Sequence, residues 1–460
     1  MMNRIMKWVA IFLFCLTAGQ TAELFSADAK EVYAARRQAF VEKMGANSVA
    51  IIKAAPEVNR NGDVDYFYRQ NSDFYYLTGL DEPEAVLILS KRGVFLRGSF
   101  QRANELLLMR ERNPHREMWD GYMIGVERAP DMLGIEAARS IDELETYMTS
   151  VVRGADTLYL KVENVGFDQP LNAELDFIKK ARQRLNDFAV VDPAGILVPM
   201  RQKKDAHELE LLKKAIEITG KGHLDVMRTA KPGMYEYQLE ATLEHAFQYN
   251  GAEREGFPSI VGSGPNSCIL HYNTNRRQTE KGDMVVLDIG AEYGMYTADI
   301  TRTIPISGKF TKEQKAIYSI VLEAQDAGIA AAVVGASFRA PNMAAYAKIQ
   351  EGLQKLGILK EDAGRGAVRD FLPHGVSHYL GLDVHDVGTY GNLQVNDVIT
   401  VEPGIYISES VAKKYDLPKA YWNIGVRIED DVLITDNGPE LLSFHAPRKP
   451  EEIEKVMAGK

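Results

Sequence analysis

The chain has 460 residues, of which 45% are hydrophobic and 26% charged, and its formal net charge is −10 at pH 7. This length exceeds the usual size of a single domain, so it predicts two globular domains. The negative charge, together with the absence of a basic run interleaved with aromatic residues, gives no support for nucleic-acid binding.

The first 22 residues have the character of a secretory signal peptide. Arg4 and Lys7 form a positive start, Trp8–Thr17 is a short apolar run, and small residues follow up to Ala22. The apolar run is too short for a convincing membrane span. We therefore expect residues 1–22 to be removed and the mature protein to be periplasmic or secreted, with no membrane attachment after processing. The alternative is a buried N-terminal helix.

Residues 23–199 alternate between helix and strand patterns, which predicts a smaller α/β domain. The boundary is expected where Pro193, Gly195 and Pro199 are followed by basic residues, within 192–204. Residues 200–460 would form the second domain, and the segment 205–208 marks the start of its first long helix. The elements expected in the first domain are a helix over 29–44, strands over 48–54, 85–89, 94–96 and 106–109, a helix opened by a capping box at 140–143, a strand over 158–162, a helix over 170–185 and a strand over 188–191.

Four carboxylates and one histidine of the second domain lie in short apolar, strand-like runs or beside Gly and Pro: Asp288, Asp299, His378, Glu402 and Glu429. A carboxylate in such a run is costly to bury unless a cation compensates its charge. Any one of them alone would more often be a solvated strand end or a salt-bridge partner, but their joint occurrence favours one shared cation site. Oxygen-rich ligation with one imidazole suits one or two hard or borderline divalent metal ions.

The spacing of the first two carboxylates predicts their geometry. Residues 285–291 and 296–303 each have the pattern of a strand, and a hairpin turning on residues 293–294 would place Asp288 directly opposite Asp299. Opposed Cβ atoms lie roughly 4.5–5.5 Å apart, where two like charges repel unless metal bridges them. A two-metal site, with ions about 3.5–4 Å apart, has a matching size. The turn itself, Tyr-Gly, is not among the favoured hairpin pairs.

Three of the nine histidines fall within twelve residues, His374, His378 and His385. His374 and His378 have the i,i+4 spacing of a helical zinc pair, but Gly375 and Gly381 disfavour a continuous helix there. A lone histidine would more often have a structural role, whereas the cluster favours a functional site.

Several segments together resemble the signature segments of aminopeptidase P, the proline-specific branch of the pita-bread metallopeptidases. The resemblance covers nearly the whole chain after the first 22 residues. It implies an α/β (α+β) fold, with a pita-bread catalytic domain over 200–460 preceded by a smaller α/β N-terminal domain over 23–199. The matching segments are 54–58 and 68–76 in the first domain and 287–291, 299–303, 374–378, 383–388, 401–404 and 427–431 in the second.

The resemblance implies a dinuclear metal site. Asp288 would chelate one ion, and Asp299 and Glu429 would bridge both ions. His378 and Glu402 would complete the second ion. All five residues are present, which argues against the metal-free creatinase branch of the fold.

The resemblance also implies roles around the metals. His271 matches a histidine that lines the active-site pocket, and His374 and His385 match histidines that contact substrate or the reaction intermediate. Tyr406 and Arg427 match residues that support the ligands, and Tyr406 would also help to bind substrate.

Trp119 carries an expectation about assembly. The segment 117–121 resembles one whose tryptophan reaches the active site of a neighbouring subunit, so the resemblance implies a homo-oligomer, a dimer or a tetramer, in which Trp119 contacts substrate. The alternative for Trp119 is a buried core aromatic.

The expected mechanism follows from the site chemistry. Two cations, Mn²⁺ in the first place and Co²⁺ or Zn²⁺ as alternatives, can hold a water and lower its pKa so that hydroxide forms near neutral pH. Glu402 would accept the proton and pass it toward the leaving proline nitrogen of an Xaa-Pro peptide. His374 and His385 would donate hydrogen bonds to the tetrahedral intermediate.

Other functions remain open. An Xaa-Pro dipeptidase (prolidase) would use the same metal ligands, so the ligands do not discriminate it from an aminopeptidase. A non-catalytic peptide-binding module would be expected to have lost metal ligands. A methionine aminopeptidase usually lacks the large N-terminal domain, and a serine hydrolase would need a Gly-x-Ser-x-Gly motif that the segments 262–264 and 375–378 do not supply.

Overall fold

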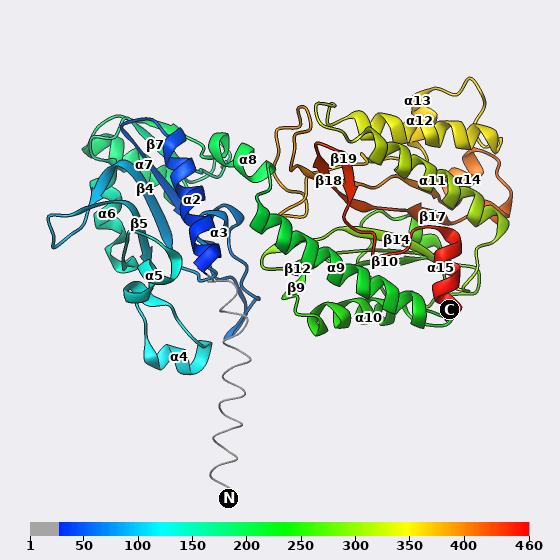
Figure 1. Cartoon of the computed structure of the whole chain (residues 1–460), viewed down its shortest axis with the longest axis horizontal. Coiled ribbons are helices and arrows are strands. Elements are labelled where there is room, and N and C mark those ends of the chain that lie inside the picture. Colours follow the sequence, from blue (N-terminus) through cyan, green and yellow to red (C-terminus); the bar gives the residue numbers. More distant parts are fainter. Residues whose placement is uncertain (1–26, 460) are drawn as a thin grey trace, which may run out of the picture. The chain divides into compact units, whose positions relative to one another are not determined.

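The computed structural model describes residues 27–459. The chain divides into two compact units, the first ending at Val198 and the second beginning at Pro199 (Figure 1). The predicted signal segment, residues 1–22, lies outside the described residues. Within residues 27–459, no helix combines the length and the apolar character that crossing a bilayer requires.

The first unit is built on a six-stranded mixed sheet with strand order β6-β5-β4-β1-β7-β8. Strand β4 pairs antiparallel with β1 and β5, whereas β6, β7 and β8 join in parallel. The strands are β1 (Ser48–Lys53), β4 (Val86–Phe95), β5 (Arg102–Met109), β6 (Ala137–Ser140), β7 (Thr157–Leu160) and β8 (Ala189–Val191), with a small hairpin of β2 (Asn59–Asn61) and β3 (Val64–Asp65). The helices are α2 (Ala27–Lys43), α3 (Ser72–Thr78), α4 (Pro114–Asp120), α5 (Gly125–Leu133), η1 (Ile141–Glu143), α6 (Leu144–Val152) and α7 (Ala173–Arg184).

Two predictions for this unit need correction. The strands expected over 85–89 and 94–96 are one strand, β4, whose register shifts between Leu89 and Val94, next to Gly93 with φ of 74°. The helix expected to open at the 140–143 capping box begins instead with a 3-10 turn, because Ser140 Oγ accepts from the Asp142 N–H, and α6 follows at residue 144.

The segment predicted as the domain boundary is largely helical. Helix α8 (Ala194–Gln202) runs through it and carries Pro199 inside. The next helix, α9 (Ala206–Thr229), starts where the sequence predicts, since Asp205 Oδ1 accepts from the Glu208 N–H and Glu208 Oε2 accepts from the Asp205 N–H, each at 3.0 Å.

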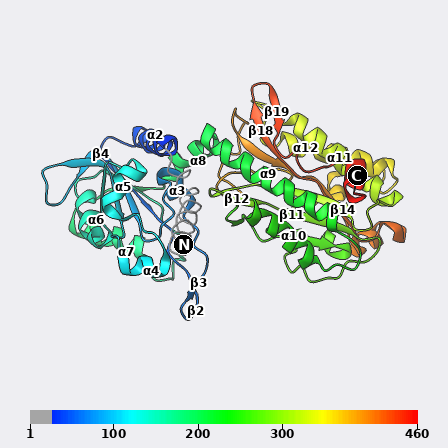
Figure 2. The same cartoon turned by 60° about the horizontal axis from the view of Figure 1, so that its bottom comes forward.

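The second unit consists of short antiparallel sheets covered by helices. Helices α9 and α10 (Glu236–Tyr249) pack together as one pair (Figures 1 and 2). Of this pair, α9 packs against β12–β14 and α10 packs against β9 and β10. Helices α11 (Lys312–Ala331) and α12 (Ala340–Lys355) form a second pair, in which α11 packs against β15–β17. The strands are β9 (Arg254–Glu255), β10 (Ile260–Ser263), β11 (Met284–Ile289), β12 (Ala291–Tyr293), β13 (Tyr296–Thr297), β14 (Ile300–Pro305), β15 (Val398–Val401), β16 (Gly404–Ile407), β17 (Ile424–Arg427), β18 (Asp430–Thr435) and β19 (Gly438–Leu441). The shorter helices are η2 (Gly264–Cys268), α13 (Arg365–Arg369), α14 (Glu409–Lys414), η3 (Lys419–Tyr421) and α15 (Pro450–Met457).

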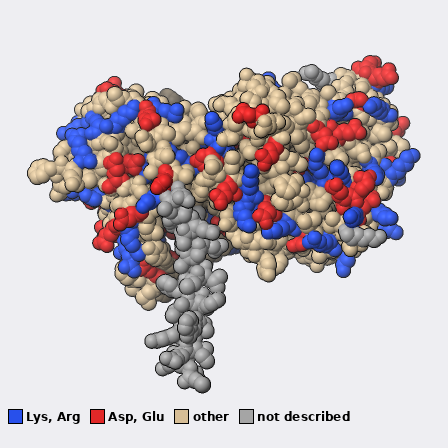
Figure 3. All heavy atoms as spheres, in the orientation of Figure 1, with Lys and Arg blue, Asp and Glu red and all other residues tan. Residues whose placement is uncertain are grey.

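Apolar side chains of both helix pairs and of the strands between them form the main core of this unit. Leu287 of β11, Leu243 of α10, Val321 of α11 and Val426 of β17 are members of it. The surface has a different character. On the face drawn in Figure 3, Lys and Arg side chains are interspersed with Asp and Glu side chains. The apolar core of this unit thus surrounds the strands whose ends carry the predicted metal ligands.

The register of the β11–β14 hairpin differs from the prediction. Asp288 pairs with Thr301, and Tyr293 pairs with Tyr296, so the turn lies on residues 294–295. Both turn residues have positive φ, 57° and 70°, as a type I′ turn requires. Asp288 and Asp299 are therefore not directly opposed. Because side chains alternate with a period of two, Asp299 still lies on the same face as Thr301 and is a diagonal neighbour of Asp288.

Candidate metal centre

One cavity of about 590 Å³ in the second unit collects most of the predicted functional residues. All five predicted metal ligands line it, together with the three histidines and the arginine that the resemblance places around the metals, and the rest of the wall is largely apolar. The functional side chains are His271, Asp288, Asp299, His374, His378, His385, Glu402, Arg427 and Glu429, and the apolar part includes Phe257, Pro258, Ile260, Leu270 and Val384. The segment 374–378 is not helical, as expected from its glycine.

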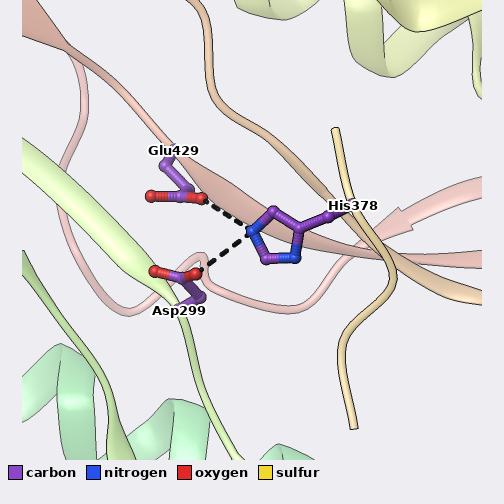
Figure 4. Close-up of side chains that lie close together, drawn as sticks. All are labelled: Asp299, His378 and Glu429. Atoms are coloured by element: carbon purple, nitrogen blue, oxygen red, sulfur yellow. Dashed lines mark ion pairs between the residues drawn. The ribbon is translucent and has the colours of Figure 1, made fainter. Parts of the chain in front are cut away.

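Three of the predicted ligands form a compact cluster. Asp299, His378 and Glu429 each offer one ligand atom, and these atoms lie within 4.8 Å of one another. Figure 4 shows the imidazole aimed at the two carboxylates; His378 Nε2 lies 3.3 Å from Asp299 Oδ2 and 4.0 Å from Glu429 Oε1. The other ring nitrogen, Nδ1, lies 2.9 Å from the Tyr379 carbonyl oxygen, so it carries the proton and leaves the Nε2 lone pair directed at the cluster.

Strand ends position the four carboxylates. Asp288 lies near the end of β11, and Asp299 directly precedes β14. Glu402 directly follows β15, and Glu429 lies between β17 and β18. His378 is tied to β15 through Thr400, whose N–H donates to the His378 carbonyl at 2.9 Å and whose hydroxyl accepts from the His378 N–H at 3.2 Å.

The charges of this cluster are not balanced by the protein alone. Burial raises the pKa of Asp299 well above its usual value, and the charge of Asp288 raises it further. Burial also raises the pKa of Glu429, and the charge of Asp299 is the second cause of that rise. Burial raises the pKa of Glu402 to about 7. One oxygen of Asp288 and one of Asp299, Oδ1 in each, are buried without a hydrogen-bond partner. Partnerless carboxylate oxygens beside an available imidazole nitrogen fit a divalent cation, so the residues present suit metal binding.

Neighbouring side chains orient the carboxylates. Arg427 Nη2 donates to Asp288 Oδ2. The Thr301 hydroxyl donates to Glu429 Oε2 at 2.6 Å, and Asp431 Oδ2 accepts from the Asp299 N–H at 3.2 Å. Sequence reasoning assigned no role to Thr301 or Asp431, although each lies two residues after a predicted ligand and alternation places it on the same face.

A hydrogen-bonded chain leads from Arg427 to His374. Arg427 Nη1 donates to the Tyr406 hydroxyl at 2.8 Å, and that hydroxyl donates to His374 Nε2 at 2.8 Å. His374 Nδ1 then carries the proton, facing the Gly375 carbonyl at 2.7 Å and lying 3.6 Å from Glu402 Oε2. Burial and, after it, the charge of Arg427 lower the pKa of His374 to about 4, so the ring is neutral at pH 7. Tyr406 is buried behind the cavity wall and supports His374 there.

The remaining predicted residues lie in different places. The ring of His385 lies 4.1 Å from that of His378, centroid to centroid, and His271 lies on a turn at the cavity wall. Trp119 belongs to α4 of the first unit and is 79% exposed, so the alternative that it is a buried core aromatic is wrong.

Comparisons with known proteins show the family of the chain. Residues 210–436 match metallopeptidase family M24, and residues 33–159 match the aminopeptidase P N-terminal domain. The chain is 41% identical to an Escherichia coli Xaa-Pro aminopeptidase over 94% of this chain and 98% of that protein. Among solved structures, Pseudomonas aeruginosa aminopeptidase PepP and a variant of Escherichia coli aminopeptidase P in complex with substrate are each 38% identical, with a TM-score of 0.84, over 94% of this chain and 98% of theirs. The α/β fold expected from the resemblance is thereby confirmed, and the chain belongs to metallopeptidase family M24 and, within it, to the aminopeptidase P proteins.

Proposed function

We propose that this protein is an Xaa-Pro aminopeptidase, a metallo-exopeptidase that releases the first residue from peptides with proline in second position. The observation that carries the proposal is the cavity in which the cluster of Asp299, His378 and Glu429 lies beside Asp288 and Glu402. The relatives named Xaa-Pro aminopeptidase support the substrate class, since the similarity extends over both units of the chain.

We assign two divalent ions to this cavity. Asp288 would hold one, Asp299 and Glu429 both, and His378 and Glu402 the other. Manganese is the proposed metal because oxygen ligands dominate, with cobalt or zinc as alternatives. When bound, such ions supply Lewis acidity that lowers the pKa of a water and polarises the scissile carbonyl.

The protein's own groups move the protons. The Glu402 carboxylate accepts a proton from the attacking water and delivers it to the proline nitrogen as that nitrogen leaves. Its side chain is 17% exposed and faces the cavity, so it can reach both water and substrate. His385, on the same wall, donates a hydrogen bond to the oxyanion of the tetrahedral intermediate. The Nδ1–H of His374 joins it when that N–H turns from the Gly375 carbonyl toward the cavity.

The shape of the wall supports recognition of proline. A peptide bond to proline has no N–H, so the site does not have to offer an acceptor for one. The apolar side chains of Phe257, Pro258 and Val384 give the ring a surface to contact. The acidic side chains at the metal centre attract the free terminal ammonium, which sets the distance from the N-terminus to the scissile bond. His271 and His374 complete the pocket.

Two further properties belong to the proposal. The exposed Trp119 suits a contact with another copy of the chain in a homo-oligomer, a dimer or a tetramer. Export is proposed from residues 1–22, and N-terminal sequencing of the native protein would give a start between Gly19 and Glu23. A retained Met1 in a cytosolic fraction would contradict export.

The decisive experiment is an assay of the purified mature protein with added Mn²⁺. We expect cleavage of the first bond in Arg-Pro-Pro and in longer Xaa-Pro peptides, much slower cleavage of the matched Xaa-Ala peptides, and none after acetylation of the N-terminus. Cleavage of Xaa-Pro dipeptides alone would make the protein a prolidase. No turnover by the metal-loaded protein would indicate a peptide-binding module.

A further inference from the structure

The basic run at the start of the second unit contains two buried cations. Arg201, on the last turn of α8, is 2% exposed, and Lys204 is fully buried, whereas the intervening Lys203 is exposed. A buried lysine or arginine is costly unless it is paired, so the partners of these two side chains identify what the run does.

Both cations hold one carboxylate, that of Asp386. Arg201 Nη2 donates to Asp386 Oδ1 and, at 2.8 Å, to Asp383 Oδ2. Lys204 Nζ donates to Asp386 Oδ2 at 2.7 Å and to the Arg201 carbonyl at 2.6 Å. Each oxygen of Asp386 thus has its own cation, and two positive charges face two negative ones. A side chain held at both oxygens has little freedom to move.

Asp386 belongs to the loop that forms one wall of the active-site cavity. It directly follows His385 and lies two residues after Val384, both of which line the cavity. Its N–H donates to the Tyr379 carbonyl at 2.9 Å, which closes the loop. The loop packs tightly at Gly381, because a Cβ there would lie 2.1 Å from Asp386 Oδ2.

The two neighbouring histidines are therefore held in different ways. His378 is tied directly to β15 by hydrogen bonds with Thr400. His385 lies in the loop closed by the Asp386–Tyr379 bond and directly precedes Asp386.

We propose that Arg201 and Lys204 are positioning residues for the reaction, which hold His385 against the metal centre by clamping Asp386. The inference rests on the proposed function, because His385 acts there as a hydrogen-bond donor to the reacting group. A displacement of about 1 Å in such a donor can lower turnover by about a hundredfold, so the clamp has kinetic consequences without touching substrate.

Lys204→Met is the direct test, and Lys203→Met is its matched control. The first variant removes one buried cation but leaves Asp386 paired with Arg201, and the second changes an exposed lysine one position away. We expect Lys204→Met to lower kcat on an Xaa-Pro peptide by about tenfold to a hundredfold. Its bound metal, measured by elemental analysis, should equal that of the wild type, because none of the metal ligands lies in the clamp. Lys203→Met should match the wild type in both.

A double-mutant cycle separates positioning from general destabilisation. In a His385→Ala background the clamp has no histidine to position, so Lys204→Met should change kcat by less than about twofold there. Equal losses in both backgrounds, or wild-type kcat in Lys204→Met, would overturn the inference and leave the proposed function intact. An inactive wild-type protein would instead overturn the proposed function.

Arg201→Lys is the second variant, for use if Lys204→Met does not fold. It keeps the charge, but the lysine side chain is shorter, so its ammonium does not reach the position from which Arg201 Nη2 contacts both Asp386 and Asp383. The same double-mutant cycle with His385→Ala applies. A loss of kcat only in the wild-type background supports the inference, and equal losses in both backgrounds overturn it.

Discussion

The two halves of the cavity are held by different means. On the metal side, Asp288, Asp299, Glu402 and Glu429 come from strands or strand ends, and the backbone ladder sets their positions. On the substrate side, the histidines come from loops and depend on side-chain bonds, His374 on Tyr406 and the loop of His385 on Asp386. The difference indicates that a lost side-chain contact on the metal side changes the orientation of a ligand that the backbone still holds, whereas on the substrate side it can move the loop that carries a donor.

The largest effect is expected on the metal side itself. Asp288→Asn replaces one carboxylate ligand by a neutral amide, which also removes the negative charge that pairs with the buried Arg427. We expect loss of bound metal and a fall in activity of a hundredfold or more, roughly the scale on which essential catalytic groups are lost. Far-UV circular dichroism should show a retained fold. An active variant with full metal occupancy would contradict the assignment of Asp288.

The substrate side should behave differently. His385→Ala removes a donor to the oxyanion and leaves the ligands in place, so kcat should fall by about a hundredfold while metal content stays unchanged. Steady-state kinetics and elemental analysis on the same preparation decide this. Loss of metal together with activity would mean that the two sides of the cavity are not separable.

A smaller effect is expected from the side chain that orients Glu429. Thr301→Val keeps the shape of the residue but removes the hydroxyl that donates to Glu429 Oε2 at 2.6 Å. Outer partners of metal ligands typically contribute about tenfold to a hundredfold in affinity, so the dissociation constant for Mn²⁺ should rise within that range. Titration calorimetry on the metal-free protein measures it, with Thr242→Val on α10, outside the cavity, as the control. An unchanged constant in Thr301→Val would exclude an orienting role for Thr301.

The smallest effect is a pH dependence of stability in the metal-free protein. Burial raises the pKa of Glu402 to about 7, above its ordinary value near 4.5, so the folded state binds more protons than the unfolded state between these values. The contribution of Glu402 to stability is therefore complete below about pH 4.5 and is lost as the pH rises through about 7. The melting temperature of the metal-free protein should fall between pH 5 and 7.5 relative to that of the Mn²⁺-loaded protein. Parallel curves for the two forms would contradict this.

Much of the site could be predicted from local sequence. The residue types of the five ligands follow from the need to bury carboxylates beside a compensating cation, and the start of α9 follows from a capping box of four consecutive residues. The hairpin register differs from the prediction because the turn includes Met295, whose φ is 70°. A positive φ is uncommon for methionine, so the residue type gives no sign that the turn includes this position. The error amounts to two residues, one period of side-chain alternation, so the carboxylates remain on the predicted face.

The sequence by itself determined the chemistry of this protein, because side-chain type decides which groups can bind a metal or carry a proton. Only the tertiary structure decided how the donors are held. The bond from Tyr406 to His374 joins residues 32 positions apart, and the bond from Lys204 to Asp386 joins residues 182 positions apart. Such contacts leave no periodicity in the chain, since they depend on where separate elements pack and not on the spacing of neighbours along one of them.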